Sequence, residues 1–251
     1  MIAEIRTEHN VCTVDLSRPH DISLPLRAGA DNPNAFFVQN PAFTPFRGGN
    51  FVGSVAEGGA CNCENLLLNP HGNGTHTECI GHITSEHITI NEVLREFMAI
   101  AVLASIEPES APNGDRVITA KQMRSVVQSL HTDVSALVLR TLPNDDAKRL
   151  RHWSGTNPPY LTEQAAEVLA VSGIRHLLLD IPSIDREEDG GKLLAHKAFW
   201  QYPYAPRREA TITEMAFIPS TLPDGAYLLN LQIASIESDA SPSKPILYSM
   251  I

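Results

Sequence analysis

Three histidines and one glutamate that can bind a metal ion are concentrated between His71 and His82. The residues at 72–74, Gly-Asn-Gly, are unfavourable inside a helix and tolerate positive φ, so we expect a turn that folds His71 back toward His76. In an extended segment, His76 and Glu78 are two residues apart and point to the same face. Imidazole and carboxylate donors at this spacing predict a site for Zn2+ or Mn2+.

Two residues far along the chain are candidates for the same site. Glu214 lies in the apolar segment 211–217, where a carboxylate is costly unless it is paired or bound to a metal. Its alternative role is a favourable charge near a helix N-terminus, just after Thr213. His196 follows the acidic tract 185–189 and precedes Ala-Phe-Trp, and its alternative role is that of an unpartnered surface histidine on a loop.

Length and composition predict an ordinary globular protein. The 251 residues fit one large or two small domains, and the absence of repeats and linkers favours a single domain, 1–251. The net charge of -10 argues against a nucleic-acid partner. No stretch approaches the roughly 18 apolar residues that span a bilayer. The first residues lack the pattern of a secretory signal, so we expect a cytoplasmic protein.

The four cysteines do not suggest a disulfide framework. Cys61 and Cys63 are too close in sequence for an unstrained disulfide, and no second pair completes a zinc-ribbon pattern. Cys79 lies inside the histidine-rich stretch, where we expect a small buried side chain. Cysteine nucleophilic catalysis by Cys79, with His76 or His82 as base, is the less favoured alternative.

Strands and helices alternate in the middle of the chain. The apolar runs predict strands, and Thr119 with Gln122 forms a capping box that predicts a helix. The alternation implies a parallel segment of sheet with right-handed crossovers. Polar residues at the carboxyl ends of these strands are candidates for function. The expected elements are strands at 99–106, 136–140 and 176–181 and helices at 119–130 and 162–173, and the polar residues are Arg140, Thr141, Asp180, Ser183 and Asp185.

The remaining segments are less regular. We expect a first strand at 11–16, a short helix at 91–97, a surface helix at 145–153 and a strand at 226–236. The proline-rich segment 25–46 carries four phenylalanines and is too apolar for a disordered linker. It can pack on the rim of the site, on a partner subunit in a homo-oligomer (dimer or tetramer), or on the protein's own core.

Taken together, these motifs resemble the cyclase family of metal-dependent hydrolases, which includes kynurenine formamidases and isatin hydrolases. The family motif is His-x-Gly-Thr-His-x-Asp-x-Pro-x-His, and residues 74–82 keep the order Gly-Thr-His-x-Glu-x-x-x-His. Weaker matches are the Asp-Ile-Ser-Leu-Pro-Leu of 21–26, the strand end 138–141 and the Asp-x-x-Ser-x-Asp of 180–185. The resemblance covers nearly the whole chain.

The chain departs from the family motif at three positions. Glu78 replaces the aspartate and is one methylene longer, so any bridging geometry must shift. Ile80 replaces the proline. The first histidine should fall at Gly72, whereas His71 stands one residue earlier, a difference that the glycine-rich turn can absorb.

The resemblance implies a fold, a site and a reaction. The fold is an α/β swivelling β/β/α-type domain with a mixed, partly parallel sheet. The implied reaction is hydrolysis of an amide bond, or of a lactone, in a small ring-bearing substrate such as an arylformamide of tryptophan catabolism. The implied metal ligands are His71, His76 and Glu78 for a first Zn2+ or Mn2+ ion and Glu78, His82, His196 and Glu214 for a second ion.

The chemistry of these residue types is consistent with that reaction. Zinc lowers the pKa of bound water from roughly 15.7 to 7, which supplies hydroxide at neutral pH. Whichever of His82, His196 and Glu214 does not bind metal can act as general acid or base. We expect Asp180, Ser183 and Asp185 to orient the ligands rather than to bind the ion.

Two other functions stay open from the sequence. The shifted His71 and the longer Glu78 also suit a metal-binding relative that has lost catalysis. A dehydratase or cyclase on the same scaffold is a further alternative. A serine hydrolase is disfavoured because Gly-x-Ser-x-Gly is absent.

Overall fold

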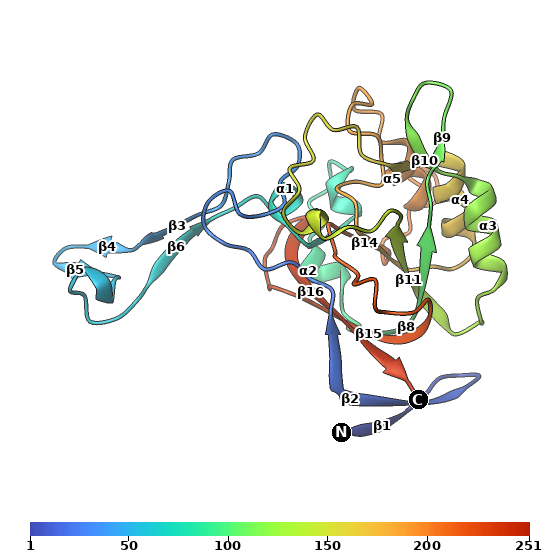
Figure 1. The fold of residues 1–251 in the computed structure, drawn as a ribbon, viewed down its shortest axis with the longest axis horizontal. Helices are drawn as coiled ribbons and strands as arrows, with labels where there is room; N and C mark the ends of the chain where they lie inside the picture. Colours follow the sequence, from blue (N-terminus) through green and yellow to red (C-terminus); the bar gives the residue numbers. More distant parts are fainter.

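A nine-stranded mixed sheet forms the body of the protein in the computed structural model, which describes residues 1–251 (Figure 1). The strand order is β1-β2-β16-β15-β8-β11-β13-β14-β7, and β16 also pairs with β7, so seven of the strands close a barrel. The strands are β1 (Ile2–Arg6), β2 (Val11–Asp21), β7 (His76–Cys79), β8 (Met98–Ile106), β11 (Val134–Thr141), β13 (His176–Leu179), β14 (Thr211–Glu214), β15 (Gly225–Ile233) and β16 (Ala240–Met250).

The parallel part of the sheet confirms the expected strand and helix alternation. Strand β11 lies between β8 and β13 and is parallel to both, and β14 continues the parallel segment. Both predicted helices form, and Thr119 and Gln122 make the predicted capping box. The helices are α1 (Pro70–Asn73), α2 (Ile90–Val93), α3 (Ala120–Gln128), α4 (Glu163–Val171) and α5 (Leu194–Phe199). None of them is long and apolar enough to cross a membrane.

Apolar side chains cover both faces of the parallel strands. Alternate residues of a strand point to opposite faces, so Leu137 and Leu139 of β11 join one core cluster and Ala136 and Val138 join another. The first cluster includes Met123 of α3 and side chains of α4 and α5, so the helices pack on the outer face of the barrel. The second cluster fills the barrel interior. The uninterrupted apolar runs of these strands follow from this two-sided burial.

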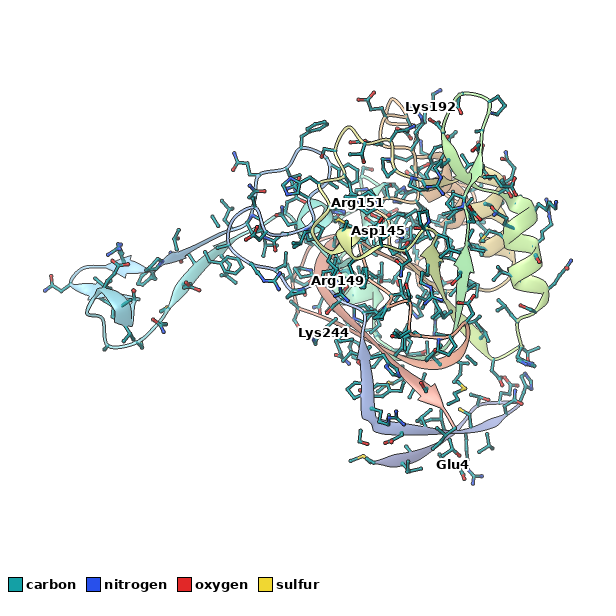
Figure 2. The ribbon with its side chains drawn as sticks, in the orientation of Figure 1. Glu4, Asp145, Arg149, Arg151, Lys192 and Lys244 are labelled. Carbon is teal, nitrogen blue, oxygen red and sulfur yellow. The ribbon has the colours of Figure 1, made fainter.

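Several elements differ in extent from the sequence expectation. The first strand is β1, and the strand expected at 11–16 extends to Asp21 as β2. The helix expected at 91–97 is the single turn α2. The surface helix expected at 145–153 is a short 3₁₀ helix, η3 (Asp146–Leu150), where Figure 2 shows Asp145, Arg149 and Arg151 grouped together. An ion pair of 2.9 Å between Arg151 and Asp145 holds this segment.

A long hairpin projects from the body between residues 42 and 67, and we call it the arm (Figure 1). Its strands leave the barrel together, and its tip carries a second small hairpin. The arm exposes apolar side chains, including Leu66 and Leu67, which are 60% and 64% exposed. The arm elements are β3 (Ala42–Pro45), β4 (Arg47–Gly48), β5 (Phe51–Val52), η1 (Val55–Glu57) and β6 (Glu64–Leu67). A small three-stranded sheet joins β9 (Glu109–Ser110), β10 (Arg116–Ile118) and β12 (Tyr160–Leu161).

A buried histidine at the start of β13 is expected to make the protein less stable in acid. Burial, together with the charge of Arg175, lowers the pKa of His176 to about 4, while the unfolded chain retains the ordinary value. Between these two pKa values the unfolded state binds more protons, so the free energy of unfolding falls as the pH falls. The full effect of this residue is about 3 kcal/mol.

The variant His176→Asn tests this expectation, because asparagine can still bond Thr211, whose Oγ1 lies 2.9 Å from Nδ1 of His176. Denaturant unfolding of metal-free protein, measured across this pH range, should show a flatter pH dependence in the variant than in the unmodified chain. Equal pH dependence in both proteins would contradict a neutral buried His176.

Candidate metal centre

The segment before β7 is a single helical turn, α1, rather than the irregular turn expected from its glycines. The side chain of Asn69 caps this turn by accepting a hydrogen bond from the Gly72 N–H. Gly72 packs so tightly that an added Cβ would collide with the side chain of Val38. The turn brings the His71 ring to within 5.2 Å of the His76 ring, centroid to centroid, as expected.

Strand β7 is extended, so His76 and Glu78 share a face as predicted. The strand pairs on both sides, with His76 opposite Glu214 of β14 and opposite Pro242 of β16. The ring of His76 is fully buried, and its Nδ1 lies 3.0 Å from the carbonyl oxygen of Gly74. Its Nε2 has no hydrogen-bond partner and lies 3.5 Å from Oε2 of Glu214.

The carboxylate of Glu78 is the centre of the cluster. Its Oε1 lies 3.0 Å from Nε2 of His196. Its Oε2 lies 3.0 Å from Nδ1 of His71 and 3.9 Å from Nε2 of His82. The side chain is almost completely buried, yet Oε2 makes no aligned hydrogen bond. All these groups therefore converge on one small volume that also includes the buried Nε2 of His76.

His196 reaches the cluster from α5, where Asp185 fixes its ring. Nδ1 of His196 lies 2.6 Å from Oδ2 of Asp185, so its other nitrogen faces Glu78. The same carboxylate accepts hydrogen bonds from the backbone N–H groups of Ala195 and His196, and it thereby holds the first turn of the helix. Asp185 therefore stands directly behind a candidate ligand, where a carboxylate fixes the ring tautomer.

The other two polar residues of this loop are placed differently. Asp180 does not reach the histidines, because its oxygens accept hydrogen bonds from Thr141 and from Nζ of Lys148. Ser183 lies at the edge of the cluster, and its Oγ accepts a hydrogen bond from the N–H of Asp185. The structure thus brings Asp185 to the site, and it assigns Asp180 to a separate buried network.

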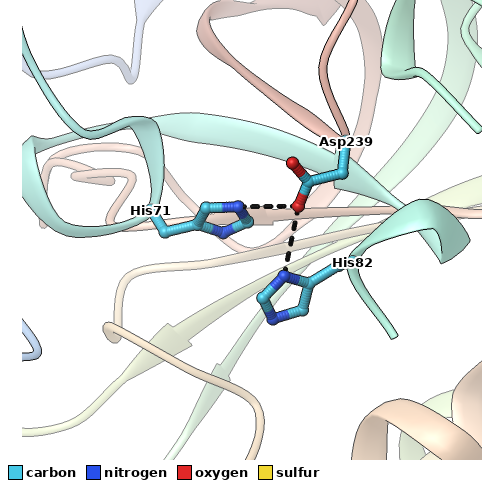
Figure 3. A group of neighbouring side chains, drawn as sticks. All are labelled: His71, His82 and Asp239. Atoms are coloured by element: carbon cyan, nitrogen blue, oxygen red, sulfur yellow. Dashed lines mark hydrogen bonds and ion pairs between the residues drawn. The ribbon is translucent and has the colours of Figure 1, made fainter. Parts of the chain in front are cut away.

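Sequence reasoning did not identify one acidic residue of the cluster, Asp239. Its Oδ2 lies 2.9 Å from Nε2 of His71 and 3.3 Å from Nδ1 of His82 (Figure 3). The residue immediately precedes β16. The prolines of this strand, at 242 and 245, argue against a strand when the sequence is read alone. Only the pairing of β16 with β7 brings Asp239 to the site.

The cluster is strongly attractive to cations. Burial opposes protonation of His71, but the carboxylates of Asp239 and Glu78 outweigh it and raise its pKa to about 10. Burial likewise opposes protonation of His196, but Asp185 and Glu78 raise its pKa to about 10. Burial also disfavours the charged form of Glu78, yet the imidazoles, with His82 first, hold its pKa well below the usual range.

The donor atoms fit a divalent ion. Three groups of three residues each place their ligand atoms within 4.8 Å of one another, and two of these groups have Glu78 in common. Nitrogen and carboxylate oxygen donors are suited to Zn2+ and Mn2+. The Nε2 of His76 and the Oε2 of Glu78 are buried without an aligned hydrogen bond, which is expected of atoms that bind a cation instead. The groups are His71, His76, Glu78; Glu78, His82, His196; and His71, His82, Asp239.

A cavity of about 230 Å³ opens beside the cluster. Its only hydrophobic lining residues are Phe36 and Leu193, and Glu214 forms part of its wall. The Oε1 atom of Glu214 accepts a hydrogen bond of 2.9 Å from the N–H of Ile184, which fixes the carboxylate. The cavity is small, acidic and partly apolar. The polar lining residues are His71, Glu78, His82, Ser183, Asp185, Arg186, Glu187, Asp189, His196 and Glu214.

Cys79 does not face this cavity. The side chain is fully buried in the barrel interior, where its Sγ lies 3.5 Å from the carbonyl oxygen of Ile88. Burial raises the pKa of the thiol to about 12. A thiol in this state is a poor nucleophile, which disfavours cysteine catalysis and agrees with the expectation of a small buried side chain.

Comparison with known proteins identifies relatives of this chain. A family model described as "Putative cyclase" matches residues 14–186. Kynurenine formamidase of Bacillus cereus is 25% identical over 233 residues, which cover 90% of this chain and 95% of that protein. Isatin hydrolase A of Labrenzia aggregata, solved with benzyl benzoate, has a TM-score of 0.67 at 17% identity, with 93% of this chain and 94% of that chain covered. A potential metal-dependent hydrolase with cyclase activity has the same TM-score and identity, with 92% of this chain and 97% of that chain covered.

Proposed function

Because this chain belongs to the cyclase family, we propose that it is a metal-dependent hydrolase that cleaves an amide or lactone bond in a small ring-bearing substrate. One observation carries the proposal. Four histidines and the buried Glu78 converge, and the Nε2 of His76 and the Oε2 of Glu78 make no aligned hydrogen bond. The similarity to kynurenine formamidase and isatin hydrolase supports the bond type.

The candidate donor groups suggest which residues would bind each metal ion. The group of His71, His76 and Glu78 would hold a first Zn2+ or Mn2+ ion, and the group of Glu78, His82 and His196 would hold a second one. When bound, such an ion polarises a carbonyl and lowers the pKa of water, so that hydroxide is available at neutral pH. The carboxylate of Glu78 belongs to both groups and would contribute to holding either ion.

Glu214 is the residue that we assign to proton transfer. It lies beside the cluster and lines the cavity, but it belongs to none of the three donor groups. Its Oε1 is fixed by the Ile184 N–H, while its Oε2 faces His76. A carboxylate held in this way can accept a proton from the attacking water and return it to the leaving group.

The cavity indicates the kind of substrate. Its volume, about 230 Å³, is below the range of 300–1,000 Å³ that is usual for drug-sized ligands, which favours a small molecule. Phe36 and Leu193 offer an apolar surface on which a flat ring can pack. An arylformamide, a cyclic amide or an aromatic lactone combines such a ring with a polar bond to be cleaved.

Turnover assays and metal analysis test the proposed function. Protein purified without chelator should contain Zn or Mn and should hydrolyse N-formylkynurenine, isatin or a related small amide or lactone. The product should gain one water, which excludes a dehydratase or cyclase reaction. Removal of the metal by a chelator should abolish turnover, and returning the metal should restore it.

A histidine variant and a matched control complete this test. His76→Ala should lose turnover, because it removes a buried candidate ligand atom, Nε2, that makes no hydrogen bond within the protein. His87→Ala removes an exposed histidine of the same region and should keep full activity. A metal-free chain with full activity would overturn the proposal, and a metal-bound chain that turns over none of these substrates would favour the non-catalytic relative.

The proposal includes a homo-oligomer built through the arm. An isolated two-stranded hairpin is marginally stable in water, and the arm exposes Leu66 and Leu67 on such a hairpin. Packing against a second copy would bury these residues.

Charged substitutions on the arm test this oligomer. Light scattering should show a dimer or tetramer for the unmodified chain and a smaller species for the double variant Leu66→Glu, Leu67→Glu. The control Tyr204→Glu, at a residue 96% exposed on the body, should leave the assembly unchanged. A monomeric unmodified chain would contradict the oligomer.

A further inference from the structure

Asp239 is held firmly at the edge of the metal centre by its backbone. Its carbonyl oxygen accepts a hydrogen bond of 3.0 Å from the N–H of Cys79, at the end of β7. The preceding carbonyl, that of Ser238, accepts a hydrogen bond of 2.7 Å from the N–H of Ile90. The hydroxyl of Ser238 donates to Oδ1 of Asp239 at 3.0 Å. These contacts leave Oδ2 directed at two histidines (Figure 3).

In both His71 and His82, each of the two ring nitrogens faces a carboxylate. In His71, Nε2 faces Oδ2 of Asp239 at 2.9 Å and Nδ1 faces Oε2 of Glu78 at 3.0 Å. In His82, Nδ1 faces Oδ2 of Asp239 at 3.3 Å and Nε2 faces Oε2 of Glu78 at 3.9 Å. One oxygen of Asp239 thus serves both rings on one side, and one oxygen of Glu78 lies near both rings on the other.

We propose that Asp239 is a positioning residue of the metal centre, which fixes the tautomer and the orientation of His71 and His82 together. A neutral imidazole that binds an ion through one nitrogen carries its proton on the other, and an acceptor on that side fixes the tautomer. With Asp239 as the acceptor, His71 is left to present Nδ1 and His82 to present Nε2 toward Glu78. The inference rests on the proposed metal-dependent function.

The other two histidines of the centre follow the same pattern. The Nδ1 of His196 faces Asp185, and the Nδ1 of His76 faces the carbonyl oxygen of Gly74. Each of the four rings therefore has an oxygen acceptor on the nitrogen that points away from the shared donor site.

Metal affinity measured by competition with a chromophoric chelator tests the assignment without relying on turnover. Asp239→Asn preserves the size of the side chain but removes its charge and one acceptor, and it is expected to weaken Zn2+ binding by about 10- to 100-fold. Glu237→Gln is the matched control, because that carboxylate lies two residues away and bonds Asn91 and Thr89 instead of the histidines. It should bind Zn2+ like the unmodified chain.

A spectroscopic readout separates positioning from a general loss of structure. In the Zn2+-loaded unmodified chain, NMR should show the ring N–H protons of His71 (on Nε2) and His82 (on Nδ1) protected from exchange with water. Asp239→Asn should lose this protection, while Glu237→Gln keeps it. Unchanged affinity and unchanged ring N–H signals in Asp239→Asn would overturn the inference.

The outcomes also separate this inference from the proposed function. If the unmodified chain binds Zn2+ without hydrolysing any substrate and Asp239→Asn binds it more weakly, the proposed function fails and the assignment of Asp239 stands. If the unmodified chain hydrolyses its substrate and Asp239→Asn binds Zn2+ equally well, only the assignment fails. A chain that binds no divalent ion would overturn both.

Discussion

Replacing Glu78 with glutamine is expected to abolish turnover and to weaken metal binding by more than the loss of a residue behind a ligand, which typically costs about 10- to 100-fold. Glu78 is almost fully buried, and its two oxygens lie between His71 and His196, each 3.0 Å away. Glutamine keeps the shape but replaces one acceptor oxygen with a donor amide, which cannot bind a cation. Because Glu78 belongs to two donor groups, the substitution should lower metal occupancy at both groups together.

Two companion variants sharpen this prediction. Glu78→Asp restores the residue of the family motif but shortens the reach by one methylene, and we expect metal affinity between those of the unmodified chain and Glu78→Gln. Glu86→Gln, at an exposed carboxylate paired with Arg208, should bind metal normally. Metal content by elemental analysis and turnover of the same samples provide the measurement. A Glu78→Gln protein with normal metal content would show that Glu78 is not a metal ligand.

The second large effect is expected on stability rather than on metal binding. Asp180 and Lys148 form a buried ion pair of 2.8 Å, and the same Nζ donates to the carbonyl oxygen of Thr141 at 2.6 Å. Removing one member leaves the other charge buried without a partner, which typically costs about 3–5 kcal/mol. Asp180→Leu should therefore lower the free energy of unfolding by about this amount, with little change in the metal affinity of the folded protein.

A substitution of Asp185, five residues further along the chain, provides a comparison with Asp180→Leu. Asp185→Asn should weaken metal binding, because it removes the charged acceptor behind His196.

The double variant Asp180→Leu, Lys148→Met should regain much of the stability lost in Asp180→Leu, because a buried ion pair can often be replaced by apolar residues of similar volume. Denaturant unfolding and chelator competition on each protein provide the measurements. Loss of metal affinity in folded Asp180→Leu would show that Asp180 acts on the centre after all.

Local patterns predicted the parts of the protein that depend on neighbouring residues. The apolar runs of β8, β11 and β13 indicated strands buried on two faces, and the capping box at Thr119 indicated the start of α3. The two-residue spacing of His76 and Glu78 predicted a shared face, because side chains alternate along a strand. The family resemblance added the order in which His196 and Glu214 join the site.

What the sequence did not reveal depends on contacts between distant segments. Asp180 and Asp185 belong to one short motif, yet Lys148 engages the first and His196 engages the second. No local pattern separates these two roles. Asp239 was missed because the prolines of β16 argue against a strand. These prolines are tolerated where the partner on one edge of β16 changes from β7 at residues 240–242 to β2 at residues 246–250.

The pairing of β7 with β16 has a consequence for how the protein is made. Strand β7 carries His76 and Glu78, and its second edge is covered only by residues 240–242, which also bring in Asp239. During synthesis, a nascent chain that has released the histidine-rich stretch still lacks this neighbour. Asp239 can therefore join His71 and His82 only after residues 240–242 have been synthesised and paired with β7.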